Sequence, residues 1–450
     1  MKFELISKGS QRLIILFAGW STRPSLYREF ARPGFDLMVV YDYTDFIFSP
    51  EESIGQYQEI CVVAWSYGVA AAHRWLASNP DIPLTRTIAV NGTPWPVDES
   101  RGISPRVFDL TLRTLSDKSV REFRKRMFKL GDSFPSFEDV ATGCLGHELE
   151  SISSLTCNAP AAQDSIGLWD KVVVSASDRI IPYDSQLNAW KGHPDIILTD
   201  WPHYPHWDTV LSMASVDKET VGRNFSHGAP TYDEEASVQR EMARRLSEMW
   251  RLSSSGRILR DVVEIGPGTG LFTRCYMSWL EGAELSFWDL ADMRPDLPGG
   301  KKICDAELEI RRLPDASVDA IAASASVQWF NSLRRFLEEC GRVLRQGGQV
   351  VLSTFGRQTF RELEGIVRPS ATYFGPEELL TLMPDSMKPE ITDGPSITVE
   401  FESPSALLRH MSLTGVNTSS SGSIVAARTI LKEGITTLTY HPVYVILTKQ

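Results

Sequence analysis

The sequence predicts an α/β protein of two or three domains, built on mostly parallel β-sheets covered by helices on both faces. In both halves of the chain, short apolar runs of strand length alternate with amphipathic helical stretches. This alternation is typical of parallel strands joined by crossover helices. At 450 residues the chain is also too long for one ordinary hydrophobic core.

The first half contains six apolar runs that predict buried strands. They lie at residues 13–18, 37–41, 59–64, 87–90, 171–174 and 196–199, with a helical pattern at residues 69–77. Residues 97 to about 165 interrupt the alternation with a charged, mostly helical segment, which we expect to form a cap over an edge of the sheet. Near residues 209–222 there is no long Gly/Ser or Pro tract. A short connection should therefore join a domain of residues 1–212 to one of residues 221–450.

The second half shows the same alternation. Strands are predicted at residues 262–265, 285–288, 320–323 and 349–353, and helices at residues 232–250 and 333–344. Gly347 and Gly348 follow the second of these helices and are a helix stop signal.

Composition argues against several classes of protein. The formal charge of −11, from 46 basic and 57 acidic residues, gives no general attraction for nucleic acid or an anionic membrane. No apolar stretch approaches the roughly 20 residues needed to cross a bilayer, and the N-terminus lacks the apolar core of a signal peptide. The six cysteines include no Cys-x-x-Cys pair, so we expect reduced cysteines, no metal site and a cytoplasmic location.

The most informative motif of the first half is Ala64-Trp65-Ser66-Tyr67-Gly68, between a predicted strand and a predicted helix. It resembles the nucleophile elbow of α/β-hydrolases, in which a tight turn lifts a serine clear of the sheet. A serine hydroxyl becomes a good nucleophile only when a base takes its proton. Ala64 departs from the pattern, which usually has glycine there.

An acid and a histidine follow two later strands in the order Ser, Asp, His of α/β-hydrolases. Asp178 lies just past the strand at 171–174, and His203 follows the strand at 196–199. In this arrangement His203 is the general base and Asp178 orients it. The backbone N–H groups of Trp20 and Tyr67 are expected to form the oxyanion hole.

Two neighbouring residues are alternatives. Asp184 could replace Asp178, although it lies further from its strand, and His206 could replace His203. The two histidines could instead bind a metal ion, but Pro205 between them prevents the usual helical presentation of such a pair.

A glycine motif, Glu264-Ile265-Gly266-Pro267-Gly268-Thr269-Gly270, follows a predicted strand in the second half. A dinucleotide-binding fingerprint would need its third glycine at Leu271. The spacing therefore disfavours a dehydrogenase and favours a class I (Rossmann-like) methyltransferase. In that reading the S-adenosyl-L-methionine (SAM) site includes Glu264, Gly266, Gly268 and Gly270.

Two acids stand where such a methyltransferase needs them. Asp289 follows the strand at 285–288 and can accept both ribose hydroxyls of the cofactor, and Asp305 suits the adenine edge. Asp292 or Asp319 could take the ribose role instead, or these acids could be solvated turn residues.

Three further motifs of the first half accompany the elbow: Phe17-Ala18-Gly19-Trp20, Asn91-Gly92-Thr93-Pro94 and Pro202-His203-Tyr204-Pro205. Together they resemble BioG, a family of pimeloyl-[acyl-carrier-protein] methyl ester esterases, over about residues 1–210. The resemblance implies an α/β-hydrolase with a helical cap and a triad of Ser66, Asp178 and His203. It also implies a substrate that is a methyl ester on an acyl carrier protein (ACP).

Motifs on both sides of the glycine loop point to a second family. They are Phe225-Ser226, Pro230-Thr231-Tyr232-Asp233, Ala236-Ser237-Val238-Gln239, Ser326-Val327-Gln328-Trp329, Ser353-Thr354-Phe355-Gly356 and Thr359-Phe360-Arg361-Glu362-Leu363. They resemble BioC, the malonyl-ACP O-methyltransferases, over roughly residues 221–450, most strongly up to about residue 365. The family's Phe-Ser-Arg-Ala-Ala has His227 at its arginine position here. Tyr232 and Trp329 are candidates for lining the substrate pocket, with core packing as the competing explanation.

The two resemblances imply opposite steps of early biotin synthesis in one multifunctional enzyme. One half would methylate the free carboxylate of malonyl-ACP, and the other would hydrolyse pimeloyl-ACP methyl ester. The carboxylate is itself the nucleophile, so no catalytic base is assigned to the methyltransferase half. Arg121, Arg124, Lys125, Arg126 and Lys129 could give the cap a positive face for the acidic ACP, or form a solvated helix face. An inactive hydrolase fold that only docks ACP is the alternative to an esterase.

Overall fold

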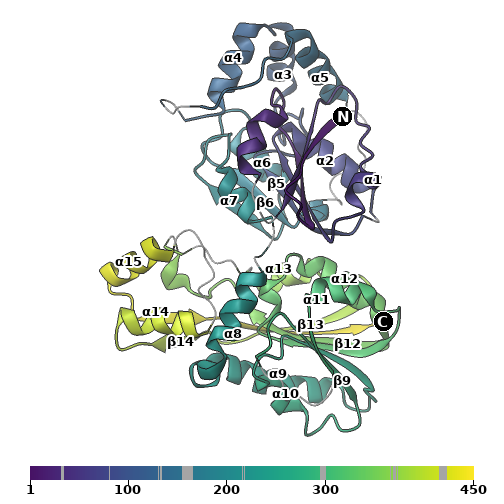
Figure 1. Cartoon of the computed structure of the whole chain (residues 1–450), viewed down its shortest axis with the longest axis vertical. Coiled ribbons are helices and arrows are strands. Elements are labelled where there is room, and N and C mark those ends of the chain that lie inside the picture. Colours follow the sequence, from purple (N-terminus) through teal and green to yellow (C-terminus); the bar gives the residue numbers. More distant parts are fainter. Residues whose placement is uncertain are drawn as a thin grey trace. The chain divides into compact units, whose positions relative to one another are not determined.

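The computed structural model describes residues 1–31, 35–80, 82–129, 131, 134–154, 166–214, 216, 218–293, 300–364, 366–367, 371, 373–414 and 423–450. The chain folds as two compact units, Met1–Ser215 and Val216–Gln450, which we call the N-terminal unit and the C-terminal unit (Figure 1). Within the described residues, no helix is both long enough and apolar enough to span a membrane.

The N-terminal unit is built on a sheet of seven strands. They are β1 (Lys2–Ile6), β2 (Arg12–Phe17), β3 (Asp36–Tyr41), β4 (Glu59–Trp65), β5 (Leu84–Val90), β6 (Lys171–Ser175) and β7 (Ile196–Thr199). Their order is β1-β3-β2-β4-β5-β6-β7, with β1 antiparallel to β3 and the other neighbours parallel. Every residue of β4 and β5 is buried, so the sheet is covered on both faces along these two strands.

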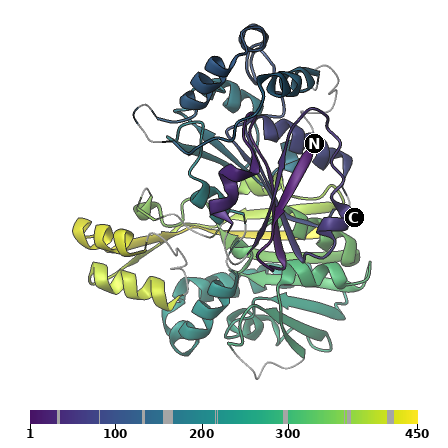
Figure 2. The same ribbon diagram turned by 45° about the horizontal axis from the view of Figure 1, so that its top comes forward.

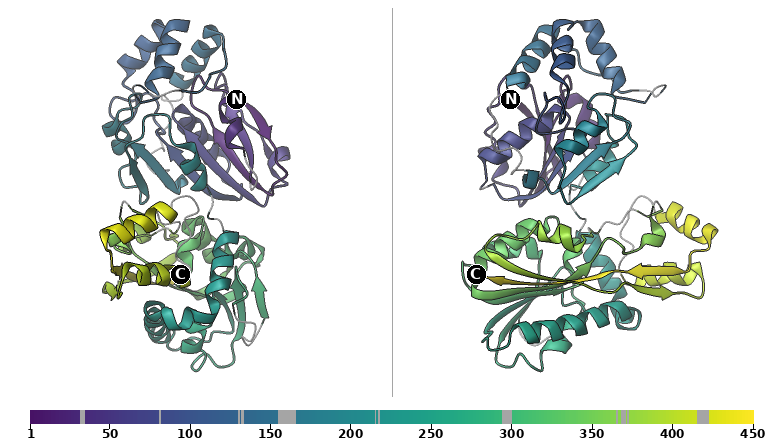
Figure 3. Two further views of the ribbon diagram at one scale, coloured as in Figure 1. Left: turned by 60° about the vertical axis from the view of Figure 1, so that its left-hand side comes forward. Right: turned by 180° about the vertical axis from the view of Figure 1, so that it is seen from behind.

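Helices cover this sheet and one end of it. Those that follow strands or lie beside them are η1 (Pro24–Phe30), α1 (Glu51–Ile54), α2 (Tyr67–Ser78), α6 (Tyr183–Ala189) and α7 (Trp207–Ser212). The segment that interrupts the alternation forms α3 (Pro105–Arg113), α4 (Asp117–Arg126) and α5 (Thr142–Ser154), and its last residues, 155–165, lie outside the described residues. These three helices lie together at one end of the unit (Figures 1 and 3). That end is the carboxyl end of β2, since the indole N–H of Trp20 donates to the Leu145 carbonyl oxygen of α5.

The C-terminal unit has a second seven-stranded sheet. Its strands are β8 (Asp261–Ile265), β9 (Glu284–Asp289), β10 (Gly300–Ile303), β11 (Val318–Ser324), β12 (Leu344–Phe355), β13 (Met387–Asp393) and β16 (Pro442–Lys449). The order is β10-β9-β8-β11-β12-β16-β13, and β16 is antiparallel to both of its neighbours. Alternate residues of β8 enter two separate apolar clusters: Val262 packs in one, and Val263 and Ile265 in the other. The sheet is therefore packed on both faces.

The remaining elements of this unit flank that sheet. They are α8 (Lys218–Glu235), α9 (Ser237–Ser253), α10 (Leu271–Tyr276), α11 (Ala306–Glu309), η5 (Val327–Trp329), α12 (Leu333–Val343), α13 (Pro376–Leu380), α14 (Pro404–Leu413), α15 (Ser423–Glu433) and the paired strands β14 (Ile397–Glu400) and β15 (Thr437–Tyr440). Helices α9 and α10 lie on one face of the sheet, and α12 lies on the other (Figure 1). Helices α14 and α15 accompany β14 and β15 beyond the large sheet (Figure 2).

The predicted α/β class is confirmed for both units, with two local differences. The helix predicted at residues 232–250 is broken at Ala236, which has the non-helical angles φ −84° and ψ 47°. The helix stop predicted at Gly347 is wrong, because α12 already ends at Val343 and the glycine lies inside β12. Gly347 has φ 76° and sits where the pairing of β12 with β11 shifts its register.

Candidate active sites

The turn between β4 and α2 carries Ser66. The serine has φ 59° and ψ −129°, a conformation that non-glycine residues rarely adopt and that costs about 1–3 kcal/mol. The turn approaches β2 closely because Gly68 has no side chain: a Cβ atom there would lie 2.3 Å from the Phe17 carbonyl oxygen. The elbow thus places the serine at the carboxyl edge of the sheet, where it is 3% exposed.

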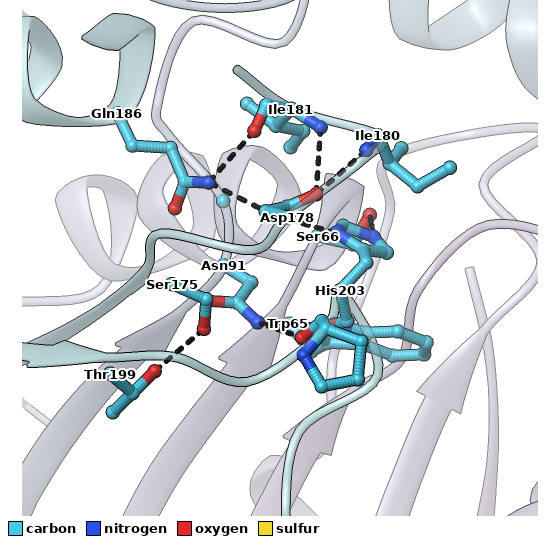
Figure 4. Close-up of polar contacts among 12 residues, drawn as sticks. Trp65, Ser66, Asn91, Ser175, Asp178, Ile180, Ile181, Gln186, Thr199 and His203 are labelled. Carbon is cyan, nitrogen blue, oxygen red and sulfur yellow. Dashed lines mark hydrogen bonds and ion pairs between the residues drawn. The ribbon is translucent and has the colours of Figure 1, made fainter. Parts of the chain in front are cut away.

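Ser66, His203 and Asp178 form one hydrogen-bonded series (Figure 4). His203 Nε2 lies 2.9 Å from Ser66 Oγ, and His203 Nδ1 lies 2.8 Å from Asp178 Oδ2. The three residues come from the carboxyl ends of β4, β6 and β7, which are parallel strands of one sheet. With a proton on Nδ1 facing Asp178, the imidazole can accept the serine proton at Nε2.

Three donors hold the Asp178 carboxylate in place (Figure 4). Its Oδ1 accepts the backbone N–H groups of Ile180 at 2.7 Å and Ile181 at 3.0 Å. Its Oδ2 accepts the side-chain amide of Gln186 at 3.0 Å in addition to the histidine. The carboxylate is therefore fixed in orientation toward the imidazole.

Two hydrogen bonds join the loop that carries His203 to Trp65 of the elbow and to Asn91, just after β5 (Figure 4). The His203 carbonyl oxygen accepts the indole N–H of Trp65 at 2.8 Å and the side-chain amide of Asn91 at 2.9 Å. These bonds explain why the elbow, the Asn91 motif and the His203 motif occur together, since each supports the position of the imidazole.

The expected oxyanion donors lie beside the serine. Tyr67 directly follows it, and a Cβ atom on Gly19 would lie 3.3 Å from Ser66 Cβ, so the loop carrying Trp20 passes close to the elbow. Neither the Trp20 nor the Tyr67 backbone N–H donates to another group among the described residues. Both N–H groups are available to a ligand there.

The alternatives to the acid and the base are not brought to Ser66. Asp184 is exposed in the first turn of α6, and His206 is exposed and stacks on Trp201 at 5.0 Å. In the described part of the chain, no group of three or more His, Cys, Asp or Glu side chains is arranged to hold a metal ion.

One of the basic residues expected on an exposed ACP-binding face of the cap is buried instead. Arg124 of α4 is buried, donates to the Ser21 carbonyl oxygen at 2.8 Å, and stacks on the Phe137 ring. Its assignment to an exposed positive face is wrong, because Phe123 and Met127 turn the same face of α4 toward the interior. The other basic residues of that set are exposed: Arg121, Lys125, Arg126 and Lys129.

A pocket in the C-terminal unit opens at the carboxyl ends of β8, β9 and β11. It holds about 890 Å³ of empty space, part of it open to solvent. Gly266 and Gly268 line it with positive φ angles of 63° and 55°, and the N–H of Gly268 donates to Asp289 Oδ2 at 2.9 Å. Burial raises the pKa of the Asp289 carboxyl above its ordinary value. The pocket therefore joins a backbone loop with little side-chain bulk to a half-buried acid.

Asp305 also lines the pocket, but its carboxylate is already engaged. Its two oxygens lie 2.7 and 2.6 Å from the Lys218 ammonium, which also contacts Glu307, and one oxygen caps α11 by accepting the Glu307 backbone N–H. Burial acts to lower the pKa of Lys218, but Glu307 and Asp305 outweigh it and raise the pKa. The sequence analysis did not single out Lys218, because no spacing rule marks a lysine that pairs with acids 87 and 89 residues away.

Two of the predicted cofactor residues, Glu264 and Gly270, are not among the described residues that line the pocket. Glu264 accepts hydrogen bonds from the hydroxyls of Thr273 and Tyr276, and burial raises its pKa to about 7. Its carboxyl group therefore stabilises α10, the helix that follows the glycine loop. Gly270 has φ 85° at the start of that helix.

The alternative ribose acids lie outside the pocket lining as well. Asp292 is 62% exposed and pairs with Lys301. Asp319 accepts the backbone N–H groups of Arg260 and Asp261.

Helix α8 covers one side of the pocket, and both predicted substrate residues face it. Tyr232 comes from α8 and Trp329 from η5, just after β11. Phe225 of α8 also lines the pocket. Asp233 ties α8 to the glycine loop through the hydroxyl of Thr269.

These two sites define the class of protein. One unit has an α/β-hydrolase fold with an ordered Ser-His-Asp series, and the other has a methyltransferase fold with a glycine-loop pocket. The family model Pimeloyl-ACP methyl esterase BioG matches residues 1–210, and the model Methyltransferase domain matches residues 263–352.

Comparison with similar proteins identifies the family. The chain is 29% identical to a malonyl-[acyl-carrier protein] O-methyltransferase of Bacteroides fragilis (strain 638R), over 97% of this chain and 93% of that protein. It is 30% identical to malonyl-[acyl-carrier protein] O-methyltransferase 2 of Ilyobacter polytropus, over 38% of this chain and 71% of that protein. Among solved structures, the crystal structure of BioG from Haemophilus influenzae has 28% identity and a TM-score of 0.40, covering 46% of this chain and 99% of that one.

The chain belongs to the family of malonyl-[acyl-carrier protein] O-methyltransferases and carries a BioG domain ahead of the methyltransferase domain. Both resemblances read from the motifs are thereby confirmed. SAM is the cofactor of the methyltransferase domain, as predicted. The pocket fits it, since it offers a glycine loop for close backbone approach, the half-buried Asp289 for a diol, and apolar walls from Leu290 and Phe330.

Proposed function

We propose that the chain carries out two reactions on acyl groups bound to ACP. The C-terminal unit methylates the free carboxylate of malonyl-ACP, and the N-terminal unit hydrolyses pimeloyl-ACP methyl ester, both within early biotin synthesis. The observation that carries the proposal is that one chain contains both the Ser66–His203–Asp178 series, inside a domain that matches BioG, and a methyltransferase pocket.

In the methyltransferase unit, Gly266 and Gly268 would hold the cofactor against the backbone, and Asp289 would bind its ribose. When bound, SAM supplies an electrophilic methyl group on a positively charged sulfur. The substrate carboxylate is already a nucleophile, so the chain would need to supply no catalytic base. The residues of the chain therefore act by alignment and exclusion of water.

In the esterase unit, Ser66 would attack the carbonyl carbon of the methyl ester while His203 takes the serine proton. His203 then gives that proton to the departing methanol, and a water molecule later releases the acid by the same route. Asp178 holds the imidazole in the required tautomer. The backbone N–H groups of Trp20 and Tyr67 would stabilise the oxyanion.

The cap is our proposed contact for ACP on the esterase side. Arg121, Lys125, Arg126 and Lys129 are exposed on and just after α4, whereas Arg124 takes no part. Carrier proteins of this kind are acidic, so exposed basic side chains speed their encounter and orient it.

Two variants of the full chain separate the reactions. Ser66→Ala should abolish hydrolysis of pimeloyl-ACP methyl ester and leave methylation of malonyl-ACP by SAM unchanged, as followed by mass analysis of the carrier protein. Asp289→Asn should do the reverse. Asp178→Asn should slow hydrolysis by roughly 10⁴-fold, because the imidazole loses its oriented tautomer. If the native chain hydrolyses no ester and no fluorophosphonate labels Ser66, the N-terminal unit is a docking module and the esterase half of the proposal fails.

A further inference from the structure

The methyltransferase pocket contains an indole N–H group without a partner. Trp329 is 5% exposed and lines the pocket, and its Nε1 is buried with no hydrogen-bond partner among the described residues. Leaving a buried donor unsatisfied costs about 1–3 kcal/mol. A ligand that brings an acceptor to Trp329 removes this cost.

A second donor faces the same pocket. Tyr232 of α8 lines it, and no described residue hydrogen-bonds to its hydroxyl. Burial, and then the nearby carboxylates of Asp233 and Asp289, raise the pKa of Tyr232, so its hydroxyl stays protonated and can donate. The Phe225 ring packs against both side chains, with ring centroids 6.1 Å from Tyr232 and 6.0 Å from Trp329.

The charged side chains of the described pocket lining provide few further partners for an anion. Lys218 is the one lysine or arginine among the described residues that line it, and this ammonium is already bound by Asp305 and Glu307. The remaining charged groups of the lining, Asp289 and Asp305, are acids. Among the described residues of the lining, a carboxylate that enters this pocket therefore meets neutral donors and no unpaired cation.

We propose that Trp329 Nε1 and Tyr232 Oη bind the free carboxylate of the acyl substrate as an uncharged receptor. This inference rests on the proposed methylation of malonyl-ACP and names the residues that recognise its reacting end. Two neutral donors can hold the carboxylate before the reaction and the carbonyl oxygen of the ester afterwards. A lysine or arginine would draw charge from the attacking oxygen and would be left buried without a counter-charge once the ester forms.

The receptor also explains selectivity. An acyl chain that ends in a methyl group leaves both donors without an acceptor, so its binding loses the two hydrogen bonds and gains nothing in their place. Hydrogen bonds to charged groups are worth about 1.5–3 kcal/mol each, which is roughly a 10- to 100-fold change in affinity per donor.

The test compares malonyl-ACP with butyryl-ACP, in which a methyl group replaces the carboxylate. Dissociation constants are measured by calorimetry on the full chain, with S-adenosylhomocysteine present so that no turnover occurs. Tyr232→Phe, which removes one oxygen, and Trp329→Phe should each weaken malonyl-ACP binding about 10- to 100-fold and leave butyryl-ACP binding within about twofold. Trp279→Phe, which removes an indole N–H that donates to Ser247 outside the pocket lining, is the matched control and should keep the native preference for malonyl-ACP.

The outcomes separate this inference from the proposed function. If the native chain neither binds nor methylates malonyl-ACP, the proposed function fails. If it does both, and Tyr232→Phe and Trp329→Phe retain the native preference for malonyl-ACP, only the receptor is overturned. The receptor is also overturned if these two variants lose affinity for S-adenosylhomocysteine while that preference is unchanged, because the donors then serve the cofactor. Where Trp329→Phe disturbs the fold, Tyr232→Phe decides.

Discussion

The Lys218→Met substitution tests how much the buried ion pairs of Lys218, the first residue of α8, contribute to the stability of the C-terminal unit. The ammonium contacts Asp305 and Glu307, and the exposed fractions of the three side chains are 6%, 15% and 7%. Removing one partner of a buried ion pair costs about 3–5 kcal/mol. Glu307 keeps the backbone N–H groups of Asn331 and Ser332 as donors, so we expect a loss near the lower end, about 3 kcal/mol.

The loss should depend on pH. Burial raises the pKa of Glu307 above its ordinary value even with the lysine present, and without Lys218 this pKa rises further. A carboxyl whose folded-state pKa exceeds its unfolded value destabilises the fold increasingly as pH rises from the unfolded to the folded pKa. The deficit of Lys218→Met should therefore be smaller at pH 5 than at pH 8.

Hydrogen exchange followed by mass spectrometry measures this deficit in each unit separately. At pH 8, protected amides of β11 and α12 should exchange roughly 100-fold faster than in the native chain, while those of β4 and β5 in the N-terminal unit stay unchanged. Arg244→Met, which removes two exposed ion pairs of α9, is the control and should leave protection as it is. A deficit below about 1 kcal/mol, or one that is equal at pH 5 and pH 8, would refute the reasoning.

Two further predictions concern packing and burial. Gly68→Ala places a Cβ atom 2.3 Å from the Phe17 carbonyl oxygen, so it should destabilise the N-terminal unit by about 1–3 kcal/mol or more in the same exchange measurement. Gly143→Ala is the control and should leave the stability unchanged, because its Cβ atom meets open space. Glu264 has a pKa raised to about 7, so its ionisation costs stability between about pH 4.3 and 7. Glu264→Gln should therefore be more stable relative to the native chain at pH 8 than at pH 5, and an equal difference at both pH values would contradict this assignment.

The sequence contained enough to predict the elements that carry both sites. Ser66, Asp178 and His203 each follow an apolar run, and parallel strands bring their carboxyl ends to one edge of a sheet. The same reasoning assigned Gly268 and Asp289 to one cofactor site, and the structure places them in contact after the ends of the neighbouring strands β8 and β9. Chain order and strand ends were sufficient because the geometry follows from the sheet itself.

Side-chain direction was harder to predict. Arg124 belongs to a charged run, yet Val120, Phe123 and Met127 mark one face of α4, and a residue four positions after Val120 lies on that same face. Applying helical periodicity inside the charged run would have placed it in the interior. Glu264 differs, because whether a strand-end acid turns toward the loop or toward the following helix depends on packing that no local pattern encodes.

The cap is connected to the residues that follow β2. Arg124 of the cap holds the Ser21 carbonyl oxygen, and Phe123 packs edge-on against Trp20 with ring centroids 4.8 Å apart. Helix α4 therefore holds Trp20 and Ser21, the residues just after β2, through one hydrogen bond and one ring contact. A substrate that shifts α4 would also shift Trp20, whose backbone N–H is the proposed oxyanion donor. The fit of the carrier-bound acyl chain against the cap would then change the rate of ester hydrolysis as well as the affinity.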